Sequence, residues 1–218
     1  NTGRMAQTVT PTAAIPLYGR SADNIRDHRH VTSLLHRIET TDTGVLVTPT
    51  LSFDERGHQV NHMTYYCVGW SGNGEKPVDF YPTAEDFVGE GGNFERPYAI
   101  VKNAEGVKAG TKIEGLEAVG GLHFSEITLE PEEECSYLIF TGITEDIQEI
   151  RNLSKTYTTR EKVLEELEKT KAYWQEKVNV AYHTGDSDFN QFMHWVSFQP
   201  ILRRIYGCSF LPHHDYGK

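Results

Sequence analysis

The sequence lacks any apolar run that approaches the roughly 18–20 residues needed to cross a bilayer. It is also poor in cysteine, and Cys67, Cys135 and Cys208 are odd in number and far apart. That pattern is typical of a reduced protein of the cytoplasm and argues against a disulfide-stabilised secreted one. No charged and then apolar signal peptide opens the sequence, although a missing N-terminus would hide one.

Positive charge is scarce as well. The sequence contains 21 Lys and Arg residues and 31 Asp and Glu residues, which gives a formal net charge of −10. Nucleic acids and anionic membranes are bound through a surplus of Lys and Arg, so both are disfavoured as partners. A neutral ligand such as a sugar fits this charge. An anion such as phosphate would need a local basic pocket.

Familiar catalytic motifs are absent: there is no Ser/His/Asp order, glycine-rich phosphate loop, CxxC pair or HExxH. Acidic pairs such as Glu165–Glu166 indicate solvated surface, since an acid–base couple needs two carboxylates facing each other across a cleft. His28 and His30 share one side of a predicted strand, as some metal ligands do. A polar strand edge is the favoured interpretation, and we predict no metal site.

Strand patterns fill the first part of the sequence. Apolar and polar residues alternate in "GVLVTPTLSFD" (Gly44–Asp54), and "NHMTYYCVGW" (Asn61–Trp70) ends at a turn. The segment Gly121–Ile143 is interpreted as a hairpin. Together they predict a β-sandwich over residues 1–150, incomplete at its N-terminus. The long glycine-containing segment Phe80–Tyr98 is predicted to be a loop with a function.

Helical patterns follow. Thr158 and Glu161 form a predicted capping box, and apolar residues then recur at helical spacing, so residues 151–184 are expected to be a helical linker. A second helix is predicted to begin after Asp186 as N-cap and to kink at Pro200.

The second predicted helix is apolar around most of its circumference, which is typical of a helix inside a helical assembly. Residues 185–218 are therefore interpreted as the incomplete start of an all-helical domain. We interpret the chain as a piece of a larger enzyme or multidomain protein. The apolar residues are Phe189, Phe192, Met193, Trp195, Val196, Phe198, Ile201 and Ile205.

The stretch "LPHHDYG" (Leu211–Gly217) follows that helix. Adjacent histidines in a loop point apart, which disfavours a metal motif, whereas His, Asp and Tyr side chains suit a loop that binds sugar hydroxyls. Arg203, Arg204 and Lys218 are the local basic residues. From the sequence alone, the arginines are best explained as charges that complement the C-terminal end of the helix dipole.

The stretch "FNQFMHWVSFQPILRRIYGCSFLPHHDYGK" resembles the segment of glycoside hydrolase family 94 that opens the catalytic (α/α)6 barrel. "FYPTAEDFVGEGG" and "EGLEAVGGLHFSEITLEP" are similar to the N-terminal sandwich of that family. The resemblance implies a mainly β fold with α: the distal part of a β-sandwich, a helical linker and the first helix of an (α/α)6 barrel. In the barrel segment it rests on Asn190, Gln199, Arg203, Gly207, Ser209 and Phe210.

The family consists of inverting phosphorylases of β-linked gluco-oligosaccharides, and the resemblance implies the same reaction here, with α-glucose 1-phosphate as product. Inorganic phosphate attacks the anomeric carbon as co-substrate, no cofactor is implied, and an aspartic acid protonates the leaving oxygen. The resemblance places that acid and the phosphate site beyond Lys218, so this chain contains no assigned catalytic residue. A homodimer is also implied.

The resemblance further implies that the barrel-entry loop approaches the sugar. Cys208 stands where many disaccharide-specific members have arginine, and the loop looks closest to laminaribiose and 1,2-β-oligoglucan phosphorylases. The residues that we predict to bind substrate are Phe210, His213, His214, Asp215 and Tyr216, with Arg203 supporting them from the helix.

Three other interpretations stay open. One is a phosphorylase-like module of the kind found in cyclic glucan synthases. Another is a non-catalytic carbohydrate-binding β-sandwich, for which the helices are only a tether. The third is an interaction domain whose apolar second helix docks a partner.

Overall fold

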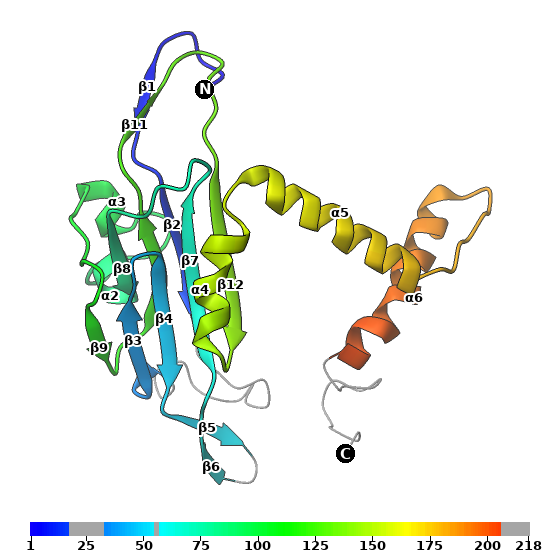
Figure 1. Cartoon of the computed structure of the whole chain (residues 1–218), viewed down its shortest axis with the longest axis horizontal. Helices are drawn as coiled ribbons and strands as arrows, with labels where there is room; N and C mark the ends of the chain where they lie inside the picture. Colours follow the sequence, from blue (N-terminus) through cyan, green and yellow to red (C-terminus); the bar gives the residue numbers. More distant parts are fainter. Residues whose placement is uncertain (18–32, 55–56, 206–218) are drawn as a thin grey trace. The chain divides into compact units, whose positions relative to one another are not determined.

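The computed structural model describes residues 1–17, 33–54 and 57–205. The chain divides into two compact units, Asn1–Lys162 and Val163–Lys218. All of the described strands lie in the first unit (Figure 1). The prediction that residues up to about 150 are rich in strands is therefore confirmed.

Among the described residues, the strands are short and two short helices interrupt them, while a third short helix and two long ones follow the last strand. The strands are β1 (Gln7–Val9), β2 (Thr12–Leu17), β3 (His36–Thr40), β4 (Gly44–Pro49), β5 (Leu51–Asp54), β6 (Gly57–Val60), β7 (Thr64–Ser71), β8 (Asp79–Thr83), β9 (Lys112–Glu114), β10 (Ala118–His123), β11 (Ile127–Leu129) and β12 (Tyr137–Thr144). The helices are α2 (Ala84–Val88), α3 (Tyr98–Lys102), α4 (Ile147–Thr156), α5 (Arg160–Lys177) and α6 (Ser187–Ile205).

Two antiparallel sheets form the body of the first unit. One has the strand order β2-β10-β8 and the other β12-β7-β4-β3-β9. They pack face to face, because β10 contacts both β4 and β7. Apolar residues from both sheets fill the space between them, so the predicted β-sandwich is confirmed. The buried residues of this core are Leu17, Ile38, Val45, Val47, Cys67, Phe80, Ala118, Leu122 and Phe124.

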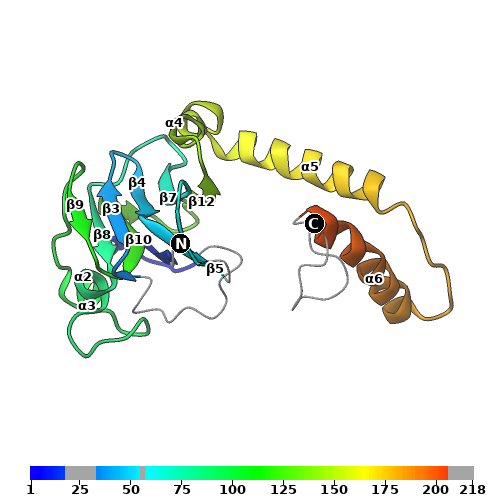
Figure 2. The ribbon, with the colours of Figure 1, turned by 90° about the horizontal axis from the view of Figure 1, so that it is seen from below.

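Helices cover the outer faces of both sheets (Figure 2). Helix α2 packs on β8 and β10, where Tyr81, Phe87 and Ala99 form a second buried cluster. Helix α4 packs on β7 and β12. Next to it, Trp70 donates from Nε1 to the Tyr157 carbonyl over 2.9 Å. The first unit therefore has four layers: α2 with α3, the small sheet, the large sheet and α4.

Two small ribbons extend beyond opposite ends of the sheets (Figure 1). One pairs β1 with β11, and the other pairs β5 with β6. The prediction that Gly121–Ile143 forms a hairpin is wrong, because its strands pair with other parts of the chain and not with one another. Strand β10 stays in the small sheet, β11 pairs with β1, and β12 pairs with β7 in the large sheet. This part of the chain crosses from one sheet to the other, so its arms do not pair.

Two further expectations need correction. The pattern over Gly44–Asp54 is not one strand, because β4 ends at Pro49 and β5 pairs separately with β6. The segment Phe80–Tyr98 is not all loop, because it includes most of β8 and all of α2. Helix α2 is capped by Thr83, whose hydroxyl oxygen accepts from the backbone N–H of Asp86.

The long helices follow the predicted pattern closely. Helix α5 begins at Arg160, one residue later than a Thr158–Glu161 capping box requires. Hydrogen bonds to its own backbone N–H and to Thr159 lower the pKa of Glu161. Asp186 is confirmed as the cap of α6, because its Oδ1 accepts from the backbone N–H groups of Asp188 at 2.9 Å and Phe189 at 3.0 Å.

Helix α6 continues through Pro200 to Ile205. Within the second unit, Trp174 packs against Phe198 with ring centroids 4.6 Å apart. Large apolar side chains of the same helix remain exposed, namely Phe189, Phe192, Trp195 and Val196. None of the described helices combines the length and the apolarity that a membrane span requires.

Candidate functional site

The substrate-binding residues predicted from the sequence fall largely outside the described part of the chain. Arg203 belongs to α6, but its side chain is outside the described residues. His28 and His30 lie outside them as well, and so do the loop residues Phe210, His213, His214, Asp215 and Tyr216. The roles assigned to these residues therefore stay predictions.

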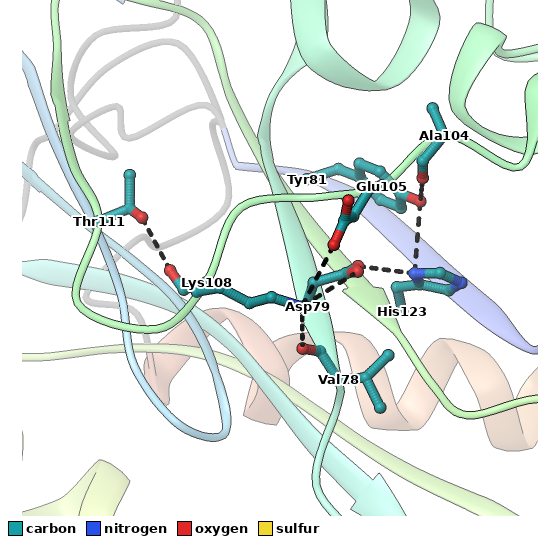
Figure 3. Close-up of polar contacts among 8 residues, drawn as sticks. All are labelled: Val78, Asp79, Tyr81, Ala104, Glu105, Lys108, Thr111 and His123. Carbon is teal, nitrogen blue, oxygen red and sulfur yellow. Dashed lines mark hydrogen bonds and ion pairs between the residues drawn. The ribbon is translucent and has the colours of Figure 1, made fainter.

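The described residues hold a different polar cluster, on β8 and β10 (Figure 3). Asp79 and Tyr81 are two residues apart on β8 and so point to the same face of the sheet. His123 on β10 lies directly opposite Asp79 in the strand register. His123 Nδ1 is 2.6 Å from Asp79 Oδ1 and 3.4 Å from the Tyr81 hydroxyl. Cross-strand pairing thus brings together three groups that are far apart in the sequence.

The hydrogen bonds of this cluster determine which of its groups donate and which accept. The short contact with a carboxylate places the proton on His123 Nδ1, which donates to Asp79. The Tyr81 hydroxyl donates to the Ala104 carbonyl over 2.5 Å. Lys108 Nζ donates to the Val78 carbonyl over 3.3 Å and lies 3.9 Å from Asp79 Oδ2. The cluster therefore anchors residues 104–108 to the sheet.

Burial, and in second place the negative charge of Asp79, raise the pKa of Tyr81 to about 12. The folded state thus holds the proton of the Tyr81 hydroxyl more tightly than the unfolded chain does, where tyrosines titrate near pH 10. The associated stabilisation is complete below the unfolded pKa and is lost as the pH rises towards the folded pKa.

This gives a prediction for Tyr81→Phe, which cannot ionise. The free energy of unfolding of the original protein should exceed that of Tyr81→Phe at neutral pH by about 1 kcal/mol, from the lost hydrogen bond. The difference should shrink as the pH rises from about 10 towards about 12, measured by urea unfolding. Tyr173→Phe, at an exposed tyrosine, is the control. A difference for Tyr81→Phe that stays constant across this range would contradict the prediction.

Beside the cluster, two adjoining hollows of about 370 Å³ each open over α2, α3 and residues 104–107. They share Gly89, Glu90 and Tyr98. We call them together the Tyr98 groove. The first hollow is lined mainly by acidic and aromatic side chains, Tyr81, Glu85, Asp86 and Glu105 among them. The second is lined by Val88, Arg96, Val101 and Lys102.

Glycine shapes the wall of this groove. Helix α2 ends at Gly89, where φ is 77°, a left-handed value that favours glycine. A Cβ atom at Gly89 would lie 2.7 Å from Cβ of Tyr98, so glycine allows the end of α2 to touch the start of α3. The Tyr98 side chain is nevertheless 52% exposed. The ring is therefore held at its base and free on the groove side.

The carboxylates of the groove do not form a metal site. Within the ranges that the structure describes, no three His, Cys, Asp or Glu side chains are grouped so that they could hold a metal ion. Sequence reasoning does not predict the groove, although it predicts a functional loop over the segment Phe80–Tyr98 that contributes to it. The T-A-E-D start of α2 was the local signal for a helix there.

Two face-to-face antiparallel sheets with helices on their outer faces define a β-sandwich domain of the large, helix-covered kind. The family model described as glycosyl hydrolase 94, supersandwich domain, matches residues 1–160. The chain belongs to this family, and the resemblance drawn from the sequence is confirmed at that level. No curated protein matches the chain. The matched range ends close to the end of the first compact unit, at Lys162.

Proposed function

We propose that the chain is part of a cytoplasmic, homodimeric glycosidic phosphorylase that reversibly cleaves β-linked gluco-oligosaccharides with inversion. The observation that carries this proposal is the match of residues 1–160 to the supersandwich domain of glycosyl hydrolase 94. The chemistry is that of the family: a phosphate oxygen bonds to the anomeric carbon, the glycosidic bond breaks, and an aspartic acid protonates the leaving oxygen. The acid and the phosphate site lie outside this chain in the proposal.

The first test is reverse phosphorolysis by the full-length enzyme. The enzyme is given α-glucose 1-phosphate and one acceptor at a time: glucose, cellobiose, laminaribiose or sophorose. We expect phosphate release with at least one acceptor, and analysis of the product then identifies the bond formed. The loop sequence favours acceptors for β-1,3 or β-1,2 bonds. If folded enzyme releases no phosphate with any acceptor, a non-catalytic role is favoured.

The loop residues provide a sharper prediction. His214→Ala or Asp215→Ala should reduce kcat/KM for phosphorolysis about tenfold, the effect of losing one or two hydrogen bonds to sugar hydroxyls. The melting temperature should stay unchanged. His183→Ala, at an exposed position just before α6, is the control and should retain full activity. If the loop variants lower the melting temperature while kcat/KM stays normal, the loop has a structural role.

A second candidate function is a carbohydrate-binding sandwich without catalysis of its own. The specific observation in its favour is the Tyr98 groove, in which an exposed aromatic ring stands among charged side chains. Sugar binding without phosphate release from α-glucose 1-phosphate would support this candidate over the phosphorylase.

A further inference from the structure

The exposed ring of Tyr98 is a fixed feature of the groove. The tyrosine opens α3, its neighbour Ala99 is 1% exposed, and Gly89 contacts it from the end of α2. Because the Tyr98 ring is held at its base, it loses little conformational entropy when a ligand packs on its exposed side. Aromatic rings combine a large apolar face with a polar tip, which suits ligands that are themselves part apolar and part polar.

Charged groups of both signs flank this ring. Glu85 and Glu90 line the first hollow, and their carboxylates make no ion pair or side-chain hydrogen bond among the described residues. Arg96 and Lys102 line the second hollow. Because Glu90 lines both hollows, the charged groups of the first hollow are hydrogen-bond acceptors, and those of the second include an acceptor and two donors.

This arrangement excludes several ligand classes. A phosphate or other anion would face a carboxylate in either hollow, since Glu90 lines both, and a strongly basic peptide would face Arg96 and Lys102 in the second. A metal ion lacks a set of ligands among the described residues. An apolar ligand would leave the charged groups desolvated without partners. A neutral polyol satisfies both sides, since each hydroxyl donates and accepts.

We infer that the Tyr98 groove binds a neutral sugar unit, with one face of the sugar ring packed on Tyr98 and its hydroxyls bonded to Glu85, Glu90, Arg96 or Lys102. The choice of a sugar rests in part on the proposed function, which makes gluco-oligosaccharides the substrate class of the enzyme. The volume of each hollow, about 370 Å³, lies in the range of small-molecule sites.

The test is isothermal titration of the full-length protein with laminaritriose or cellotriose in phosphate-free buffer. Sugar that binds at the predicted substrate loop would obscure binding at the groove. The titrations therefore use a protein that already carries His214→Ala and Asp215→Ala. Tyr98→Ala should weaken sugar binding about tenfold, and Tyr98→Phe should keep it within about twofold because the ring remains. Ile100→Ala is the matched control: this residue is 48% exposed on the same helix and does not line the groove.

The salt dependence of binding distinguishes a neutral sugar from a charged ligand. The affinity for the trisaccharide should be nearly the same at about 0.05 and 0.5 M NaCl, because no net charge is bound. Binding that is equal in Tyr98→Ala and in its background would overturn the groove site. So would binding of an oligolysine probe that depends on Tyr98 and disappears at high salt.

The two proposals fail separately. If the enzyme releases phosphate from α-glucose 1-phosphate but binds trisaccharide independently of Tyr98, only the groove site is overturned. If sugar binding depends on Tyr98 and no phosphate is released with any acceptor, the phosphorylase proposal is overturned and the groove site is upheld.

Discussion

Gly44→Ala should destabilise the sandwich by about 3 kcal/mol or more, which is large for a single added methyl group. Gly44 opens β4 and pairs with Val68 of β7 in the middle of the large sheet. A Cβ atom there would lie 2.6 Å from Cα of Val68 and would overlap the carbonyl oxygen of Cys67. Both obstacles are backbone atoms, so the clash can be relieved only if β4 and β7 move apart.

The measurement is urea unfolding of the 218-residue chain followed by tryptophan fluorescence. The chain has three tryptophans, and Trp174→Phe with Trp195→Phe leaves Trp70, which is 3% exposed in the sandwich, as the reporter. Gly74→Ala is the control. Its φ is 86° and a Cβ atom there meets nothing within 4 Å, so only the left-handed backbone costs energy, about 1–2 kcal/mol. Equal unfolding midpoints for the two variants would contradict the pairing of β4 with β7.

Asp79→Ala should cost about 3 kcal/mol, because it breaks a buried pair by removing one partner. The Asp79 side chain is 5% exposed, and its carboxylate accepts from His123 over 2.6 Å. After the change, His123 Nδ1–H keeps only the Tyr81 hydroxyl at 3.4 Å, and Lys108 loses one of its neighbours. The anchor between the sheet and residues 104–108 is therefore weakened as well.

Two further variants test whether the burial of the Asp79 carboxylate explains the large cost expected for Asp79→Ala. Asp79→Asn keeps the size of the side chain and an acceptor oxygen, so it should cost about 1 kcal/mol, the worth of one weakened hydrogen bond. Asp42→Ala removes the exposed ion pair with Lys76, and pairs of that kind contribute about 0–1 kcal/mol. The same Trp70 fluorescence assay measures all three. If Asp79→Ala costs no more than Asp42→Ala, the His123–Asp79 pair does not support the sheet.

The existence of strands could be predicted from the sequence, but their pairing could not. The segment Asn61–Trp70, which ends at a turn, identifies β7 without reference to the rest of the chain. Pairing depends on which apolar faces meet in the folded domain. The two ends of Gly121–Ile143 belong to different sheets because β10 is buried within the small sheet while β12 pairs with β7. No pattern within that segment reveals this separation.

The short helices show a different limit. Thr83 followed by Asp86 marks the start of α2, and Asp146, which accepts from the backbone N–H of Gln148, marks the start of α4. Both signals are visible in the sequence, but α2, with five residues, offers too few turns for apolar periodicity to support its cap. The polar cluster was harder to foresee. Asp79 and His123 are 44 residues apart, and only the register of β8 with β10 brings them together.

The contact between Trp70 and Tyr157 has a practical consequence for cutting the protein into pieces. The ring of Phe140 stacks between those of Trp70 and Tyr157, at centroid distances of 5.1 Å and 5.4 Å. A fragment that stops at residue 150 would lose Tyr157 and more than half of α4, and would expose this aromatic surface to other molecules. Such a fragment should aggregate. One that extends through Thr159 keeps the aromatic stack and its hydrogen bond, and is the better choice for crystallisation or spectroscopy.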